Sequence, residues 1–154
     1  HRIEDALQAT RAAVEEGIVA GGGVSFLAAS SVLDSVQTSD ADEKIGVEII
    51  RKALEAPVRT IANNAGFEGS VVVEKIKALP TGQGLDSASG QYGDMIEMGV
   101  LDPVKVTRTT LQNAASVASL ILITEATVSE MPKDTTIEES ISRAAAQGGQ
   151  GGMY

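Results

Sequence analysis

Apolar residues recur at helical spacing along most of the chain, with polar residues between them. In the first segment Ile3, Leu7 and Val14 follow this spacing, and Gly17 ends the pattern. The periodicity predicts a helix over residues 2–17. By the same criterion, further helices are predicted over residues 23–36, 41–55, 57–65, 70–79 and 104–123.

Two of the central helices carry capping signals at their first residues. Asp40 followed by Glu43 is a capping pattern ahead of the helix at 41–55. Ser70 stands at the start of the helix at 70–79, where its hydroxyl can accept a hydrogen bond from a free backbone N–H. These signals fix where both helices are expected to begin.

The last predicted helix is also the most apolar one. Asp102 and Pro103 are a preferred N-cap and a preferred first residue for a helix over residues 104–123. Apolar and small side chains occupy much of its circumference. A helix that is apolar nearly all round is usually buried, so we expect this one at the centre of the fold.

Glycine-rich and β-branched stretches predict a small amount of sheet. Residues 81–101 carry five glycines and predict two short strands, around 84–87 and 98–101, joined by a loop. Residues 125–131 predict an edge strand, and residues 148–154 are too rich in glycine to fold. The predicted fold class is therefore mainly α, a helical bundle with a small β-hairpin and an edge strand.

Composition narrows the range of functions. The chain has 154 residues, of which 43% are hydrophobic and only 3% aromatic, so the core must be built from aliphatic side chains. The formal net charge of −9 argues against binding to nucleic acid or to an anionic membrane. Cysteine is absent and the one histidine is His1, so thiolate metal sites and a histidine-based active site are not expected. Helical periodicity without a cap at the first residues favours a piece of a longer protein.

The triple glycine Gly21-Gly22-Gly23 stands between two predicted helices. A turn between the helices is one interpretation. The other is that a phosphate or ribose lies against bare backbone, since glycine has no Cβ and the helix that follows offers free N–H groups. No Gly-Lys-Ser/Thr follows, so this is not a Walker motif.

Three further segments have a structural and a chemical interpretation. Asp102 is a helix cap, or a carboxylate that accepts hydrogen bonds from ribose hydroxyls, and the two roles are compatible. Residues 84–89 form a tight hairpin, or a small-residue surface whose backbone reads the edge of a base. Glu4 and Asp5 are a solvated acid pair, or one of them orients an attacking water in phosphoryl transfer.

Taken together, the motifs resemble one family. Four stretches follow one another along the chain: HRIEDALQATRAAVEEGIVAGGGV, EAPVRTIANNAG, YGDMIEMGVLDPVKVTRTTLQNAASVASLILITEATVSEMPK and a Gly-Gly-Met end. This combination closely resembles the group I chaperonins, the heat-shock chaperonins of bacteria, mitochondria and chloroplasts. The resemblance covers essentially the whole chain and is weakest at residues 30–44 and 133–147.

The resemblance implies a domain organisation. Group I subunits have apical, intermediate and equatorial domains, and the equatorial domain is built from both ends of the chain. Residues 1–16 match the C-terminal segment of an intermediate-domain helix, and residues 17–132 match the C-terminal half of the equatorial ATP-binding domain. Residues 133–154 match a flexible glycine-rich tail. The implied fold is a chaperonin equatorial-domain-like helical bundle, without the apical domain and the N-terminal half.

The resemblance also implies functional residues. Asp5 matches the catalytic carboxylate that positions the attacking water in ATP hydrolysis. Gly22 matches the nucleotide-contacting glycine, so it has a ligand-based reason to be bare, whereas Gly21 and Gly23 have only a backbone reason. Asp102 matches the acid that holds the ribose.

The segment implied to lie around the adenine is Asp86, Ser87 and Ala88. Many family members have Asn-Ala-Ala there, so Asp86 and Ser87 depart from the commonest pattern, and a backbone contact is what carries over. The phosphate-binding loop and the aspartate that carries Mg²⁺ belong to the family's N-terminal half, so no metal ligand is predicted in this chain. We therefore expect the isolated chain to hydrolyse ATP negligibly.

The predicted function is that of an ATP-dependent protein-folding chaperonin subunit. The implied partners are identical subunits in a heptameric and double ring, a co-chaperonin lid and unfolded client proteins, with no nucleic acid and no membrane. Residues 125–130 match a strand that pairs with a neighbouring subunit. Cytoplasm is the expected compartment, with the mitochondrial matrix and plastid stroma as alternatives. A competing interpretation is a non-enzymatic helical interaction module made from a truncated chaperonin.

Overall fold

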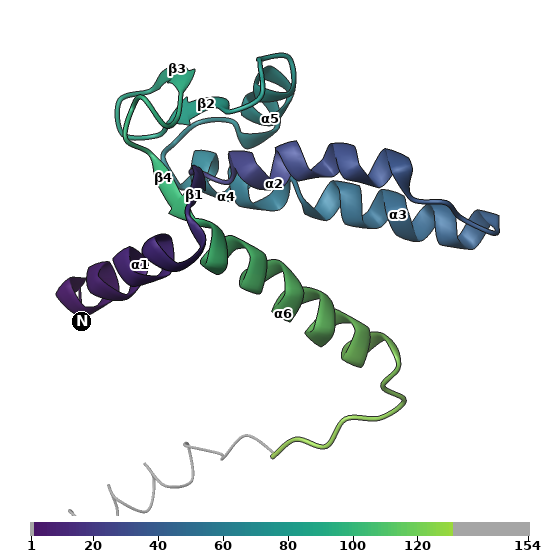
Figure 1. Cartoon of the computed structure of the whole chain (residues 1–154). Helices are drawn as coiled ribbons and strands as arrows, with labels where there is room; N and C mark the ends of the chain where they lie inside the picture. The colour runs from purple at the N-terminus through teal and green to yellow at the C-terminus, as the bar shows by residue number, and fades with distance from the viewer. Residues whose placement is uncertain (1, 131–154) are drawn as a thin grey trace, which may run out of the picture. The chain divides into compact units, whose positions relative to one another are not determined.

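The computed structural model describes residues 2–130, and most of these residues are helical (Figure 1). The helices are α1 (Arg2–Glu16), α2 (Val24–Ala29), the 3-10 helix η1 (Ser30–Ser35), α3 (Ala41–Ala53), α4 (Ala56–Asn64), α5 (Gly69–Lys77) and α6 (Val104–Leu122). The strands are β1 (Ile18–Ala20), β2 (Gln83–Asp86), β3 (Gln91–Asp94) and β4 (Leu101–Pro103). The mainly α fold class is confirmed. Among the described residues, no helix has both the length and the apolar character needed to cross a bilayer.

The chain divides into two compact units, residues 1–118 and residues 119–154. The described part of the second unit consists of the end of α6 and residues 123–130, which form neither helix nor strand. The edge strand predicted at 125–131 is therefore absent from the described residues of that range. A strand exists through hydrogen bonds to a partner, and no described segment pairs with this one. The predicted tail at 133–154 lies outside the described residues.

Two antiparallel pairs of strands form the sheet part of the first unit. β2 pairs with β3 as a hairpin, with Gly84 opposite Gly93. β1 pairs with β4, with Val19 opposite Asp102. The strands predicted around 84–87 and 98–101 do not pair with each other. The second strand of the hairpin lies at 91–94, and the later strand pairs instead with a segment that the helical pattern did not reveal.

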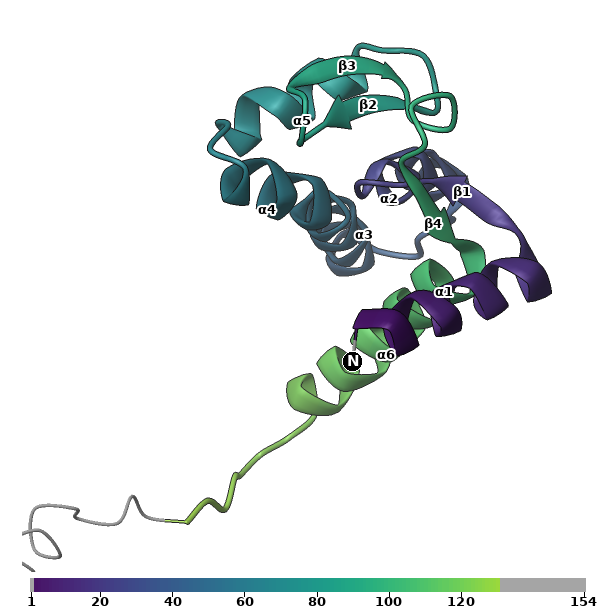
Figure 2. The same cartoon turned by 90° about the vertical axis from the view of Figure 1, so that its left-hand side faces the viewer.

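The β1–β4 pair connects α1 and the start of α6 to the rest of the first unit (Figures 1 and 2). Gly17 makes this connection possible, because its φ of 88° lets the chain turn out of α1 and into β1. The N–H of Val104 donates to the carbonyl of Gly17 at 3.0 Å. The first turn of α6 is therefore held directly against the end of α1.

The core lies between α2, α4, α5 and the β2–β3 hairpin. Its fully buried members include Val73 and Met95, each with 0% of its surface exposed. The residues of the cluster are aliphatic, as the composition predicted: Ala20, Val24, Leu27, Val58, Ala62, Val72, Val73, Ile76, Leu85 and Met95.

The helix predicted over 23–36 divides into α2 and η1 at a run of serines. The hydroxyls of Ser30, Ser31 and Ser35 each donate to the carbonyl three residues earlier, at 2.6, 2.9 and 2.7 Å. Serine hydroxyls compete with the backbone N–H groups for helix carbonyls. This competition accounts for the tighter 3-10 geometry after Ala29.

The capping signals had mixed outcomes. Asp40 caps α3 as predicted, because its Oδ1 accepts from the N–H groups of Asp42 at 2.9 Å and Glu43 at 2.8 Å. Glu43 reaches back to the N–H of Ser39 at 2.7 Å, and this hydrogen bond lowers its pKa. Ser70 is not the cap of α5. Glu68 takes that position and accepts from the Ser70 N–H.

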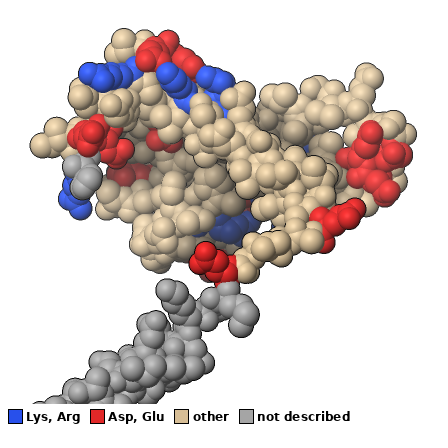
Figure 3. Space-filling view, turned by 90° about the horizontal axis from the view of Figure 1, so that it is seen from below, with Lys and Arg blue, Asp and Glu red and all other residues tan. Residues whose placement is uncertain are grey.

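The predicted burial of the long helix was wrong. No residue of α6 is buried, and Leu120 and Ile121 are 63% and 67% exposed. Apolar residues around a helix predict burial only where other elements supply a covering surface. Within the described residues, no element buries a side chain of α6. Figure 3 shows broad areas of the surface without charged side chains.

A charged network stabilises the packing of α4 on α5. Glu55, at the start of α4, has a side chain only 15% exposed and lies 2.7 Å from both Arg59 and Lys77. Lys77 also pairs with Glu74 at 2.8 Å. The hydrogen bond from Lys77 is the main reason that the pKa of Glu55 is lowered.

We expect Glu55→Gln to reduce the free energy of unfolding by about 1–2 kcal/mol at pH 7, because two charged partners lose their acceptor charge. Because the pKa of Glu55 is lowered in the folded state, the ion pair contributes its full stabilisation at pH values well above 4.5, the ordinary pKa of the carboxyl group. This contribution is lost as the pH falls from 4.5 through the lowered pKa of the folded state. Urea unfolding at several pH values measures both effects.

The control for this prediction is Glu74→Gln, which removes one pair of the same network with a carboxylate that is 72% exposed. It should cost less than about 0.5 kcal/mol. Equal losses for the two variants, or a loss at Glu55 that does not depend on pH, would contradict the role given to Glu55.

Candidate functional site

The triple glycine forms the turn between β1 and α2. The N–H of Gly21 donates to the carbonyl of Val100 at 2.9 Å. Gly22 and Gly23 have φ values of 66° and 82°, in the left-handed region that glycine tolerates and other residues rarely adopt. A Cβ at Gly23 would lie 2.8 Å from the backbone N of Val58.

Gly22 lies where two other segments approach the turn. A Cβ there would be 3.0 Å from Met95 Cε and 3.9 Å from both the carbonyl oxygen of Leu85 and Val100 Cγ1. The sequence assigned Gly22 a ligand-based reason to lack a side chain, beside the possibility of a simple turn. The positive φ of Gly22 and its proximity to Met95 are reasons within the fold, which support the turn interpretation.

The structure thus brings together three of the predicted site segments. The turn at Gly22 lies beside Leu85, which precedes Asp86, and beside Val100, which leads into β4 and Asp102. The pairing of β1 with β4 places Val19 and Asp102 opposite each other. Segments up to about 80 residues apart in the sequence therefore lie next to one another.

Asp86 ends β2 and organises the turn that follows. Its carboxylate accepts from the N–H of Ala88 at 3.0 Å and from the hydroxyl of Ser89 at 2.5 Å. These hydrogen bonds, with Ser89 first, lower the pKa of Asp86. Ser87 is half-buried and Ala88 is exposed. The Asp86 carboxylate is thus engaged within the turn, which leaves the backbone of this segment as the group able to contact a ligand.

Asp102 is in a different position from the one predicted. It lies in β4 and does not cap α6, whose first residue is Val104. The N–H of Val104, the first residue of α6, donates instead to the carbonyl of Gly17. Asp102 is half-buried, and burial raises its pKa with no hydrogen bond from the described residues to offset it. A half-buried carboxylate of this kind is a good acceptor for ligand hydroxyl groups.

Asp5 lies in the first turn of α1, where its side chain is exposed. It does not contact Gly22 or Asp86. It lines a groove between α1 and the start of α6, together with Arg11, Pro103 and Lys105. Pro103 lies in β4 next to Asp102, so the groove borders the strand that carries Asp102.

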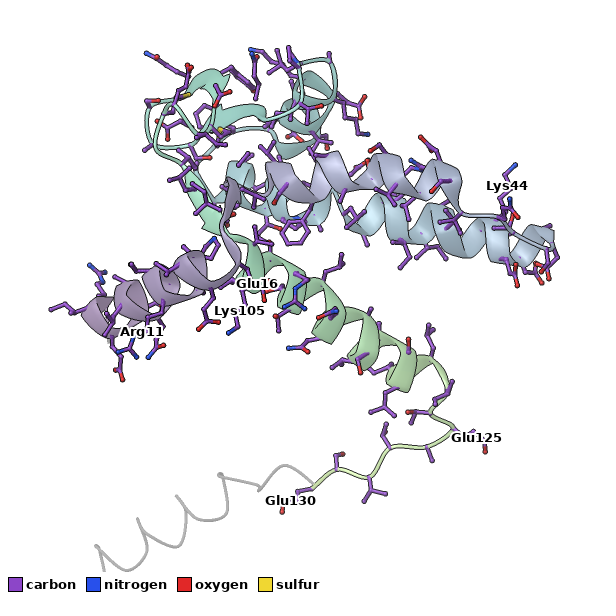
Figure 4. The ribbon with its side chains drawn as sticks, viewed as in Figure 1. Arg11, Glu16, Lys44, Lys105, Glu125 and Glu130 are labelled. Carbon is purple, nitrogen blue, oxygen red and sulfur yellow. The ribbon has the colours of Figure 1, made fainter. Side chains whose placement is uncertain are left out.

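Two ion pairs fix the end of α1 against α6. Arg108 donates to Glu16 through its Nη2 and Nε groups, at 2.6 and 3.1 Å, and Lys105 pairs with Glu15. The Arg108 hydrogen bond lowers the pKa of Glu16. Figure 4 labels Glu16 and Lys105 at this junction, and Arg11 farther along α1. The carboxylate of Asp5 is thus carried on a helix tied to the segment that follows Asp102.

Comparison with known proteins decides the family. The model of the TCP-1/cpn60 chaperonin family matches residues 1–132. The chain belongs to the TCP-1/cpn60 chaperonin family. A solved group III chaperonin in the open state is similar to it, with 32% sequence identity and a TM-score of 0.66 over 76% of this chain. The match spans 25% of that chaperonin's chain.

The family-level resemblance is confirmed by these matches, and the helical fold with its small β-hairpin is that of a chaperonin. The solved relative belongs to group III, so the assignment of this chaperonin chain to group I stays a prediction. The domain boundaries after residues 16 and 132 also stay predictions.

Whether the chaperonin residues fit a nucleotide can be tested on the geometry. Gly22 is half-buried backbone without a side chain, and the Asp102 carboxylate accepts no hydrogen bond from the described residues. This set suits the ribose and base side of a nucleotide. Magnesium is a different case. In the described part of the chain no three acidic or histidine side chains converge to hold a metal ion, so these residues offer no site for Mg²⁺.

Sequence reasoning missed the residues beneath the chaperonin site. Met95 and Val100 contact the glycine turn, and Gly84 allows β2 to approach, since a Cβ there would lie 2.4 Å from Val24 Cγ2. Met95 and Val100 lie in and next to a turn, where no periodic pattern marks a residue as buried. The one available signal was the pair of glycines Gly22 and Gly84, which indicates that two backbones approach each other closely.

Proposed function

We propose that this chain is the C-terminal part of a subunit of an ATP-dependent protein-folding chaperonin, and that it carries the ribose and base side of the ATP site. The observation that supports the proposal is the β1–β4 pair. It places Val19 opposite Asp102, the turn at Gly22 lies beside Leu85 and Val100, and Asp5 lines a groove with Pro103.

Each group has a defined task in this proposal. The carboxylate of Asp102 accepts hydrogen bonds from the ribose hydroxyls, and the bare backbone at Gly22 lets the nucleotide approach closely. The backbone of Asp86, Ser87 and Ala88 borders the base. Asp5 orients and deprotonates the attacking water. ATP with Mg²⁺ supplies the phosphoryl group, and the metal ligands belong to another part of the subunit.

The remaining parts of the proposal concern the assembly. We propose that identical subunits form a heptameric ring, as a double ring closed by a co-chaperonin lid, in which unfolded client proteins fold. The cytoplasm is the proposed compartment, with the mitochondrial matrix and the plastid stroma as alternatives. Support for the assembly comes from the family resemblance.

Asp102→Asn tests the nucleotide site in the complete subunit. We expect the dissociation constant for ATP to rise about tenfold, the effect of weakening charge-assisted hydrogen bonds to the ribose. The free energy of unfolding should stay unchanged or rise slightly, because the half-buried carboxylate no longer pays for desolvation. Calorimetric titration with ATP and urea unfolding measure the two quantities.

The matched control is Asp94→Asn. Asp94 accepts from the N–H groups of Ile96 and Glu97 at 2.9 and 3.1 Å, and an asparagine oxygen can keep both bonds. ATP affinity should remain at the wild-type value in this variant. Normal affinity in Asp102→Asn would remove Asp102 from the site.

A further expected result concerns the 154-residue chain by itself. It should hydrolyse ATP no faster than buffer, because the described part of the chain offers no cluster of metal ligands. Phosphate release from highly purified chain, compared with the complete subunit at equal molarity, measures this. Turnover that remains after removal of any contaminating chaperonin would contradict the expectation.

A second function is favoured by the exposed apolar residues of α1 and α6. Ile3, Leu7 and Val14 are 87%, 48% and 83% exposed, and Val117 is 57% exposed. Apolar surface of this kind promotes association, so the chain could act as a non-enzymatic interaction module. Sedimentation of the purified chain tests this role, since a stable monomer that binds no chaperonin subunit would exclude it.

A further inference from the structure

Met95 fills the space between the glycine turn and the β2–β3 hairpin. Its side chain has 0% of its surface exposed. A Cβ at Gly22 would lie 3.0 Å from its Cε, and a Cβ at Gly84 would lie 2.9 Å from its Sδ. Both glycines therefore lie next to the same methionine side chain. The length and position of this side chain set the distance between the Gly22 backbone and β2.

The backbone of Met95 is bonded to both neighbouring segments. Its N–H donates to the carbonyl of Gly82 at 3.1 Å, just before β2. Its carbonyl accepts from the N–H of Val100 at 2.8 Å, and the Val100 carbonyl in turn accepts from Gly21 at 2.9 Å. One residue thus connects the segment before β2, the segment before β4 and the glycine turn.

We propose that Met95 is a positioning residue for the nucleotide, an inference that rests on the proposed function. It is fully buried and carries no group that could bond a phosphate or a ribose, so it acts through Gly22 and through the segment that leads to Asp102. An unbranched thioether adapts to the narrow space between two glycines, and its length lets it reach the turn.

The experiment compares Met95→Ala with Val73→Ala in the complete subunit. Val73 is also 0% exposed and belongs to the same core, but none of its atoms is among those nearest to a Cβ at Gly22 or Gly84. Both truncations leave a cavity and lower the stability. Affinity for ATP is measured by calorimetric titration at a temperature at which both variants remain folded by circular dichroism.

We expect the dissociation constant of Met95→Ala for ATP to rise about fivefold, which corresponds to the loss of one backbone hydrogen bond to the nucleotide. Val73→Ala should bind with the wild-type dissociation constant. The rate at saturating ATP should change less than about twofold in both variants, because Asp5 is carried on α1. Met95→Leu, which keeps most of the volume, should restore the affinity.

The inference is overturned if Met95→Ala binds ATP normally, or if Val73→Ala loses as much affinity. If Met95→Ala does not fold, Met95→Val takes its place, because the valine side chain is also too short to reach Gly22. The same fivefold rise in the dissociation constant for ATP is expected for Met95→Val. Failure of the proposed function gives a different result, since Asp102→Asn would then bind normally as well. Impaired binding in Asp102→Asn with normal binding in Met95→Ala contradicts only the role of Met95.

Discussion

Asp5→Ala lowers the turnover number of the complete chaperonin subunit for ATP by about 10²- to 10³-fold, the contribution of a carboxylate that orients and deprotonates an attacking water. The dissociation constant for ATP changes less than threefold, because Asp5 lies on α1, away from the turn at Gly22 and from Asp86. Steady-state kinetics and calorimetric titration measure the two values.

Stability is not expected to change much in this variant. Asp5 is exposed and no hydrogen bond or ion pair within the described residues depends on its side chain. The loss of an acid from the first turn of a helix costs at most about 1 kcal/mol. A large loss of turnover therefore reports on the chemistry rather than on unfolding.

Glu4→Ala is the matched control for Asp5→Ala. Glu4 is the other acid in the first turn of α1 and is equally exposed, but it does not line the groove that contains Pro103. Turnover in Glu4→Ala should remain within about twofold of wild type. If both substitutions reduced turnover alike, the effect would come from the charge of the helix end, and Asp5 would lose its assigned role.

Local patterns predicted the helices well because a helix is encoded by neighbouring residues. The apolar spacing located α1, α3, α4, α5 and α6 within a few residues of their observed ends. The capping pattern at Asp40 and Glu43 was also local and is present in the structure. The serines after α2 were the exception, since their effect on helix geometry depends on rotamers that the sequence does not show.

The β1–β4 pair could not be predicted because it is both short and distant in sequence. Ile18–Ala20 has three residues, too few for an alternating pattern, and its partner begins at Leu101. The Asp102-Pro103 sequence has the local signature of a helix start, and pairing with Val19 overrides it. The prediction that α6 is buried was wrong for a related reason, since the sequence indicates an apolar surface and not what covers it.

The candidate site residues were predicted through the family resemblance, and the proximity of their segments became visible only in the fold. No spacing rule relates Gly22 to Asp86 or to Asp102. Their approach depends on Met95, which holds the turn, and on Gly84, which lets β2 come close. Contacts of this kind occur between side chains and bare backbone in turns, where neither periodicity nor capping gives a signal.

Gly23→Ala lowers the free energy of unfolding by about 3 kcal/mol, from two sources that can be separated. The left-handed φ of 82° costs about 1 kcal/mol in a residue with a Cβ. The remaining part, about 2 kcal/mol, is due to overpacking, because the new Cβ would lie 2.8 Å from the backbone N of Val58 and backbone cannot rotate away.

Gly66→Ala isolates the first source. Gly66 has nearly the same φ, 86°, but a Cβ there would meet nothing within 4 Å. Urea unfolding of the same chain should therefore show a loss of about 1 kcal/mol at Gly66. Equal losses at the two positions would mean that the approach of the turn to α4 contributes nothing. The larger loss at Gly23 would give the third glycine its own reason within the fold, separate from any nucleotide.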